Sequence, residues 1–241
     1  MNNLDFLIYS SHKTSTQSLL KILHNNNYKA QHIHILNHMK LLSPKYNNIT
    51  NLDELKKLFL LDVYSYVANN NKKLSIISIV RNPHRRLLSS FFQSYHCDQI
   101  TYLNTPPSET SVSKLNLQEL FDLYYSNILL NKLPGIVESI DQLSYVFDTD
   151  IIKNLEDKVN YHYYENDFIK LYVLNFDKVI ARNNVEYLNN VIQLNLTING
   201  SANLSEEKEY YEKYNKLKEF VSYNNNINNM IDYKFNKFYF T

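Results

Sequence analysis

The chain has 241 residues, of which 44% are hydrophobic and 20% are charged, and its formal net charge is +1. A chain of this length can form one α/β domain or two small ones, and its composition is ample for a core; we expect a single domain over 1–241. The near-neutral charge argues against general nucleic-acid binding, and the single cysteine, Cys97, excludes an internal disulfide.

The sequence predicts a cytoplasmic protein without a membrane span. It does not open with a basic region followed by an apolar stretch, which a secretory signal requires. No apolar run approaches the roughly 20 residues that cross a bilayer. The use of one cysteine also fits a reducing compartment.

The first predicted elements are a strand over 4–10 and a helix over 16–25. The segment between them holds Lys13, and a run of hydroxyl and amide side chains leads into the helix: Thr14, Ser15, Thr16, Gln17 and Ser18. A loop that opens a helix offers unpaired backbone N–H groups and the positive end of the helix dipole. We therefore predict a loop that binds phosphate or sulfate. A solvated helix start capped by serine and threonine is the alternative.

This loop departs from the Walker pattern G-x-x-x-x-G-K-[ST] because it contains no glycine, so an ordinary Walker NTPase is disfavoured. Its order Lys-Thr-x-Thr-x-Ser-Leu resembles instead the 5′-phosphosulfate loop of sulfotransferases that use 3′-phosphoadenosine 5′-phosphosulfate (PAPS), written P-K-[TS]-[GA]-[ST]-[TS]. His12 replaces the proline of that pattern, and Ser15 replaces its glycine or alanine. The resemblance implies that the residues from Thr14 to Ser18 hold the phosphosulfate. It also implies that Lys13 acts in both binding and catalysis.

A second strand is predicted over 30–36, where His32 and His34 share one face. A zinc site is disfavoured because no third ligand lies nearby, and a partly exposed pair without function is one alternative. The functional interpretation is a general base, since imidazole titrates near working pH. The His-x-His pair also resembles that of uronyl 2-O-sulfotransferases, whose second histidine is the base. This resemblance implies His34, with His32 as its neighbour or substitute.

A helix over 52–69 and a strand over 74–81 follow, and Pro83 is suited to open a helix over 83–96. Predicted strands and helices thus alternate along the first part of the chain, and this order is typical of an α/β protein. We expect a P-loop-like parallel sheet flanked by helices, as in the sulfotransferase fold, with a helix-rich C-terminal half.

The spacing R-N-P-x-x-R-x-x-S-x-F at Arg81, Arg86, Ser89 and Phe91 resembles the 3′-phosphate-binding motif of the same sulfotransferases. The resemblance implies that Arg81 and Ser89 hold the 3′-phosphate of the nucleotide, with Arg86 beside Ser89 on one helix face. Arginine suits this role because its planar fork donates two hydrogen bonds to one phosphate. A solvated basic helix face is the alternative.

The later half of the chain carries fewer signals. A helical stretch is predicted over 115–146, strands over 161–165 and 170–176, and helices over 184–194 and 205–223. Segments within 147–177 resemble a bacterial family of sulfotransferase-like capsular polysaccharide synthesis proteins. The aromatic stripe of the last helix predicts core packing, with an oligomer interface or an acceptor platform as alternatives.

These motifs together predict a sulfotransferase that moves a sulfuryl group from PAPS to a hydroxyl of a glycan or another small hydroxylated acceptor. The resemblance implies a role in polysaccharide or capsule biosynthesis, with PAPS as co-substrate and no metal. Two alternatives remain open. One is an inactive nucleotide-binding module in polysaccharide assembly, and the other is an atypical P-loop phosphotransferase.

Overall fold

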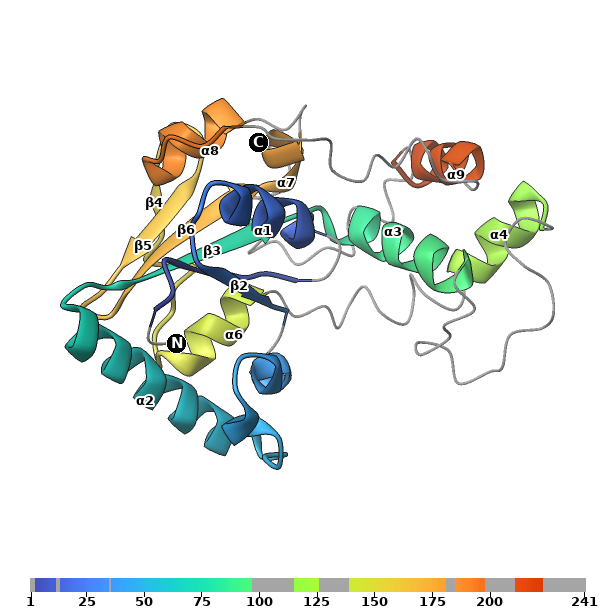
Figure 1. Ribbon diagram of the computed structural model, residues 1–241. Coiled ribbons are helices and arrows are strands. Elements are labelled where there is room, and N and C mark those ends of the chain that lie inside the picture. Colours follow the sequence, from blue (N-terminus) through green and yellow to red (C-terminus); the bar gives the residue numbers. More distant parts are fainter. Residues whose placement is uncertain are drawn as a thin grey trace. The chain divides into compact units, whose positions relative to one another are not determined.

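Figure 1 shows the computed structural model of the chain. The structure describes the following residues: 3–11, 14–34, 36–96, 115–125, 139–180, 185–197 and 211–222. The chain divides into two compact units, unit 1 (Met1–Val80 and Val137–Ala202) and unit 2 (Arg81–Ile136 and Asn203–Thr241). Each unit combines two separate stretches of chain, so no single cut in the sequence separates them. The expectation of one domain stays a prediction.

A six-stranded sheet with the order β2-β1-β3-β6-β5-β4 forms the centre of unit 1. Its strands are β1 (Phe6–Tyr9), β2 (Ala30–Ile33), β3 (Leu74–Val80), β4 (Glu156–Asp157), β5 (His162–Glu165) and β6 (Ile169–Asn175). The first four strands in that order run parallel, whereas β5 pairs antiparallel with both β6 and β4. The α/β class is confirmed, but the sheet is mixed and the expectation of a parallel sheet is wrong at this edge. The connection from β5 to β6 is too short for the crossover that a parallel pair needs.

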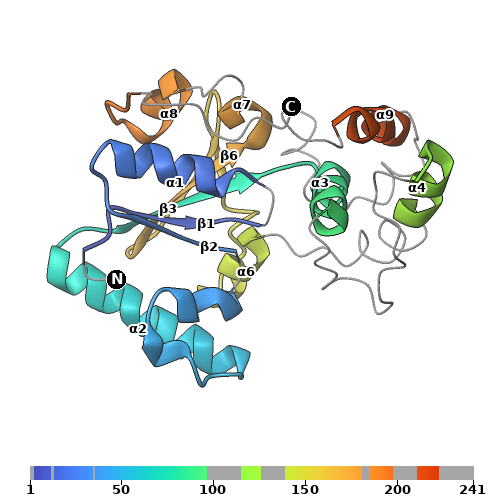
Figure 2. The same ribbon diagram turned by 45° about the vertical axis from the view of Figure 1, so that its right-hand side comes forward.

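Helices cover both faces of this sheet (Figures 1 and 2). One face carries α1 (Thr16–Asn25), α7 (Phe176–Ile180) and α8 (Val185–Ile192), and the other carries α2 (Leu52–Asn70) and α6 (Ser139–Val146). Between β2 and α2 lie two short 3-10 helices, η1 (Leu36–Leu41) and η2 (Pro44–Tyr46).

The core of unit 1 forms where the apolar stripes of α1 and α8 meet the sheet. Leu19 and Leu23 of α1 pack in one cluster with Ile8 of β1, Ile77 of β3 and Leu188 of α8. Burying each such side chain contributes about 1.5–3 kcal/mol relative to leaving it in water. This packing fixes α1 against the sheet next to β1.

Unit 2 contains three described helices: α3 (Pro83–His96), α4 (Leu117–Tyr124) and α9 (Tyr211–Ser222). Aromatic rings join them, with Phe91 of α3 at 5.3 Å from Tyr124 of α4 and Phe92 at 5.6 Å from Tyr214 of α9, measured between ring centroids. Leu217 of α9 is 1% exposed. The predicted stripe of the last helix therefore packs on neighbouring helices at these two positions.

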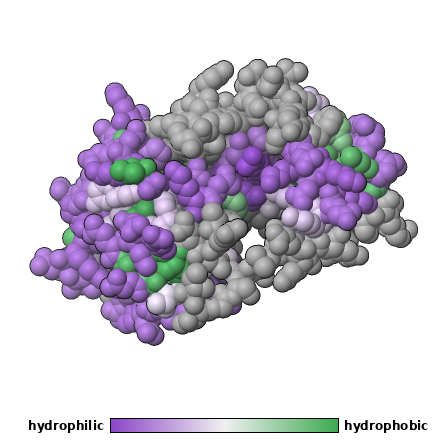
Figure 3. All heavy atoms as spheres, turned by 90° about the horizontal axis from the view of Figure 1, so that it is seen from above, coloured by the Kyte–Doolittle hydropathy of each residue, from purple (hydrophilic) through white to green (hydrophobic). Residues whose placement is uncertain are grey.

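The surface of the described residues is mostly hydrophilic in the view of Figure 3, with small separate apolar spots. Scattered apolar side chains of this kind are usual on protein surfaces. Within the described ranges, every helix is too short or too polar to cross a bilayer.

Candidate functional site

The candidate site lies at the carboxyl ends of the parallel strands of unit 1. The chain runs from β1 to β2 on one side of β1 and then returns to β3 on the other side. Open α/β sheets bind their ligands outside the carboxyl ends of the strands where the strand order reverses in this way. The predicted anion loop follows β1 at that point.

Ser10, the first residue after β1, ties the three strands together there. Its backbone N–H donates to the Ile33 carbonyl at 3.1 Å. Its buried hydroxyl accepts from the Ile79 N–H at 3.0 Å and lies 2.7 Å from the Ile79 carbonyl oxygen. The Ser10 hydroxyl oxygen also lies 2.8 Å from the Thr14 hydroxyl oxygen. The Thr14 hydroxyl donates to the Ser11 carbonyl oxygen at 2.6 Å. One serine side chain therefore links β1 to β3 where the loop begins, and Thr14 closes the loop on itself.

The loop enters α1 through a left-handed residue. Ser15, directly before Thr16, has φ 57° and ψ 27°. A residue with a Cβ atom pays roughly 1–2 kcal/mol for this conformation, which glycine adopts freely. Ser15 is also the position at which the sulfotransferase pattern has glycine or alanine. The backbone geometry gives a physical reason for glycine there but not for alanine, whose Cβ atom meets the same cost.

We expect Ser15→Gly to stabilise the protein by about 0.5–1 kcal/mol, because glycine relieves the left-handed strain. Ser18→Gly, in the first turn of α1, is the matched control and should destabilise by up to about 0.5 kcal/mol, because glycine is a poorer helix former than serine. Urea unfolding followed by circular dichroism measures both. Destabilisation by both glycines would contradict the strain at Ser15.

The remaining loop residues differ in exposure. Thr14 and Thr16 are buried, Ser18 is half-buried and Gln17 is exposed in the first turn of α1. Lys13 lies outside the described residues, as does His12. The predicted role of the lysine therefore stays a prediction from the sequence.

His34 stands beside this loop in a defined hydrogen-bonded state. Its Nδ1 atom lies 2.8 Å from the Ser10 carbonyl oxygen. A carbonyl oxygen only accepts, so Nδ1 carries the hydrogen of this bond, and in the neutral imidazole Nε2 is then the nitrogen without a hydrogen. This is the tautomer that a general base needs, with Nε2 as the proton acceptor.

Two further histidines flank His34. The ring centroid of His32 lies 5.1 Å from that of His34. The ring centroid of His38, a residue of η1, lies 5.9 Å from that of His34. Burial, and secondly the nearby His38, lower the pKa of His32. The Nε2 atom of His32 also lies 3.1 Å from the Gln17 side-chain amide nitrogen, which connects the histidines to the first turn of α1.

The sequence does not indicate His38 as a site residue, because the strand predicted over 30–36 would carry the chain away from His34. The strand instead ends at Ile33, and η1 begins at Leu36, whose N–H donates to Gln142 Oε1 of α6 at 3.0 Å. The same Oε1 accepts from the buried hydroxyl of Tyr9 at 2.7 Å. Gln142 thus holds the turn that brings His38 back to His34. Among the described residues, no group of three or more His, Cys, Asp or Glu side chains is arranged to hold a metal.

The predicted 3′-phosphate residues belong to unit 2. Arg81 directly follows β3, and α3 begins at Pro83 as predicted. Asn82 connects the two, since its carbonyl accepts from the Arg86 N–H at 3.0 Å. Ser89 is half-buried, whereas Arg86 is only 8% exposed and so is not part of a solvated helix face.

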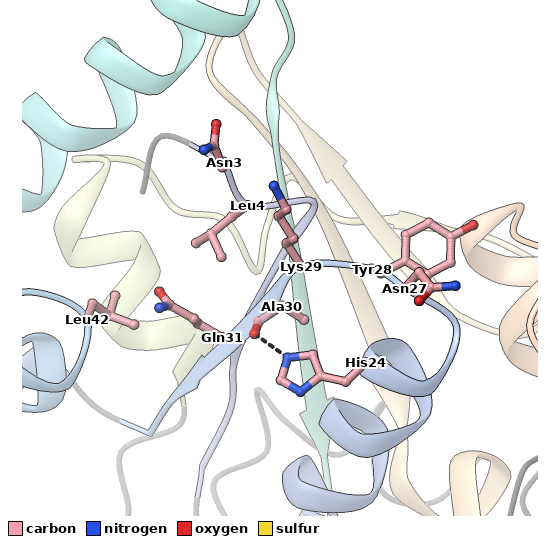
Figure 4. A pocket seen from close by; sticks show the side chains of 9 residues that line it. All are labelled: Asn3, Leu4, His24, Asn27, Tyr28, Lys29, Ala30, Gln31 and Leu42. Carbon is pink, nitrogen blue, oxygen red and sulfur yellow. Dashed lines mark hydrogen bonds between the residues drawn. The ribbon is translucent and has the colours of Figure 1, made fainter.

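A separate depression of about 500 Å³ lies at the amino ends of β1 and β2, away from the carboxyl ends where the candidate site lies (Figure 4). Lys29, Ala30 and Gln31 line it together with His24 of α1. His24 Nε2 lies 2.8 Å from the Ala30 carbonyl oxygen, so it donates to a carbonyl of the edge strand β2. The histidine thereby covers one backbone acceptor that an added strand would use.

The carboxyl edge of unit 1 thus combines a hydroxyl-rich loop, a left-handed entry into a helix and an imidazole with a defined tautomer. This set suits transfer of an anionic group to a hydroxyl, since the loop can hold the anion and the imidazole can take the proton. Comparison with protein-family models, curated proteins and solved structures found no match for this chain.

Proposed function

We propose that the protein transfers a sulfuryl group from PAPS to a hydroxyl of a glycan or another small hydroxylated acceptor. One observation carries the proposal: the loop between β1 and α1 adopts a left-handed conformation at Ser15, a conformation that favours glycine, and glycine is one of the two residues of the sulfotransferase pattern there. The position of this loop, at the strand-order reversal of an α/β sheet, adds support. A sulfotransferase-like, P-loop-like fold is part of the same proposal.

The donor would be held at both of its phosphate groups. Backbone N–H groups of the loop and the first turn of α1, together with Lys13, would bind the 5′-phosphosulfate. Arg81 and Ser89 would bind the 3′-phosphate, for which the guanidinium fork is suited. The support for this pairing is the resemblance of the two motifs to the two phosphate-binding motifs of PAPS-dependent sulfotransferases.

Transfer would proceed in line. The acceptor oxygen forms a bond to sulfur while the bond from sulfur to the bridging phosphate oxygen breaks. His34 Nε2 takes the acceptor proton, and the Lys13 ammonium group neutralises charge on the departing bridging oxygen. The products are the sulfated acceptor and 3′-phosphoadenosine 5′-phosphate. Positioning and charge stabilisation supply most of the acceleration, as in phosphoryl transfer.

Transfer of radiolabelled sulfate from PAPS to a panel of glycans tests this function. We expect label on at least one glycan, and excess unlabelled 3′-phosphoadenosine 5′-phosphate should suppress it by competition. Binding of that nucleotide without transfer to any acceptor would favour an inactive module. Transfer of the γ-phosphate of ATP to the same panel would favour a phosphotransferase.

A further inference from the structure

We propose that Tyr214 of α9 binds the nucleotide together with Arg81, and that its hydroxyl donates a hydrogen bond to the 3′-phosphate. The inference rests on the proposed function for the identity of the ligand. It adds to the site a residue that lies 133 positions from Arg81 in the sequence. Both residues belong to unit 2.

The contact between the two side chains defines the direction of their hydrogen bond. Arg81 Nη2 lies 3.2 Å from the Tyr214 hydroxyl oxygen. A guanidinium group has N–H donors and no acceptor, so the hydroxyl oxygen must accept here. The hydroxyl proton of Tyr214 is not used in this bond. The pair therefore places an O–H donor next to the positively charged guanidinium group.

Packing within unit 2 holds the hydroxyl in this place. The Tyr214 ring meets the Phe92 ring of α3 edge to face, with an interplanar angle of 83°. Leu217, almost one turn further along α9, is fully buried. At the start of the helix, Lys213 Nζ donates to the Leu115 carbonyl at 2.7 Å. Groups that bind ligands well are supported in this manner, because a side chain locked by packing loses little freedom when the ligand arrives.

The donors at this position suit a phosphate monoester. Such a group carries a charge of about −1.5 to −2 and offers three acceptor oxygens at neutral pH. The guanidinium supplies the positive charge, and the phenol O–H supplies a hydrogen bond to a phosphate oxygen. Tyr214 adds this donor without adding charge. The hydroxyl also orients Arg81 before the ligand binds.

The test compares Tyr214→Phe with the wild type by calorimetric titration of two nucleotides. Tyr214→Phe removes the hydroxyl and keeps the ring against Phe92. We expect affinity for 3′-phosphoadenosine 5′-phosphate to fall about 10-fold, a typical loss for a hydrogen bond to a charged group. Affinity for adenosine 5′-phosphate, which lacks the 3′-phosphate, should stay unchanged. Tyr211→Phe, on the same helix and also half-buried, is the matched control and should change neither affinity.

Each other outcome is decisive. If the wild type prefers the bisphosphate and Tyr214→Phe keeps the full preference, the role of Tyr214 is overturned and the proposed function stands. If Tyr214→Phe weakens both nucleotides equally and lowers the melting temperature, the hydroxyl has only a structural role and the inference is overturned. If the wild type shows no preference for the 3′-phosphate, the proposed function fails and the inference fails with it.

Discussion

His34→Ala is expected to lower the turnover number of sulfuryl transfer by about 10²–10⁴-fold, the range usual for loss of a general base. The affinity for 3′-phosphoadenosine 5′-phosphate should change little, because in the proposed mechanism the imidazole acts on the acceptor and not on the nucleotide. The expectation rests on the Nδ1 bond to the Ser10 carbonyl, which places the hydrogen of the neutral ring on Nδ1, and on the proposed role of Nε2 as proton acceptor. Steady-state kinetics with a sulfated glycan as product measures the effect.

Two matched variants separate the base from its neighbours. His34→Asn keeps an N–H donor near the Ser10 carbonyl but has no basic nitrogen, so it should lose as much turnover as His34→Ala. His32→Ala keeps the base and removes only a flanking ring, so its turnover should fall less. Full loss in His32→Ala with near-normal turnover in His34→Ala would transfer the role of base to His32.

Acid is expected to destabilise the protein through a second histidine. His84, on α3, is 3% exposed, and its Nδ1 atom is buried without a hydrogen-bond partner. Burial, and secondly the positive charge of Arg85, lower the pKa of His84 to about 4. The unfolded chain binds a proton at this side chain near pH 6.5, whereas the folded chain does not until about pH 4. The contribution of neutral His84 is thus fully present above about pH 6.5 and is lost as the pH falls toward 4.

The expected loss from this one group is about 3 kcal/mol across that pH range. Urea unfolding of the wild type at pH 7, 6, 5 and 4.5 measures the slope of the unfolding free energy with pH. His84→Leu removes the titrating group and keeps an apolar side chain, so its slope should be shallower than that of the wild type. Equal slopes in the two proteins would contradict a buried neutral His84.

The sequence predicted the elements that depend on local signals. The ranges 16–25 and 83–96 are those of α1 and α3 because apolar periodicity and Pro83 mark them without help from distant residues. The strand over 74–81 was likewise confirmed to within one residue, since its apolar side chains are buried on both faces of the sheet.

Features that depend on distant contacts could not be predicted. The end of β2 at Ile33 and the position of His38 rest on Gln142, 106 residues away from Leu36. The sequence predicts the two strands β5 and β6 but not their antiparallel pairing, which follows from the short connection between them. The contact between Arg81 and Tyr214 involves a helix whose aromatic stripe predicted core packing, with an oligomer interface or an acceptor platform as alternatives. Lys13, the residue with the clearest motif, lies outside the described residues.

A crystal structure with bound 3′-phosphoadenosine 5′-phosphate tests the central claim most directly. The proposal predicts the 5′-phosphate within about 2.7–3.2 Å of Lys13 and the N–H groups that open α1. It predicts the 3′-phosphate at similar distances from Arg81 and Ser89 of the same molecule. A nucleotide bound elsewhere, or one whose 3′-phosphate points into solvent away from Arg81, would contradict the assignment.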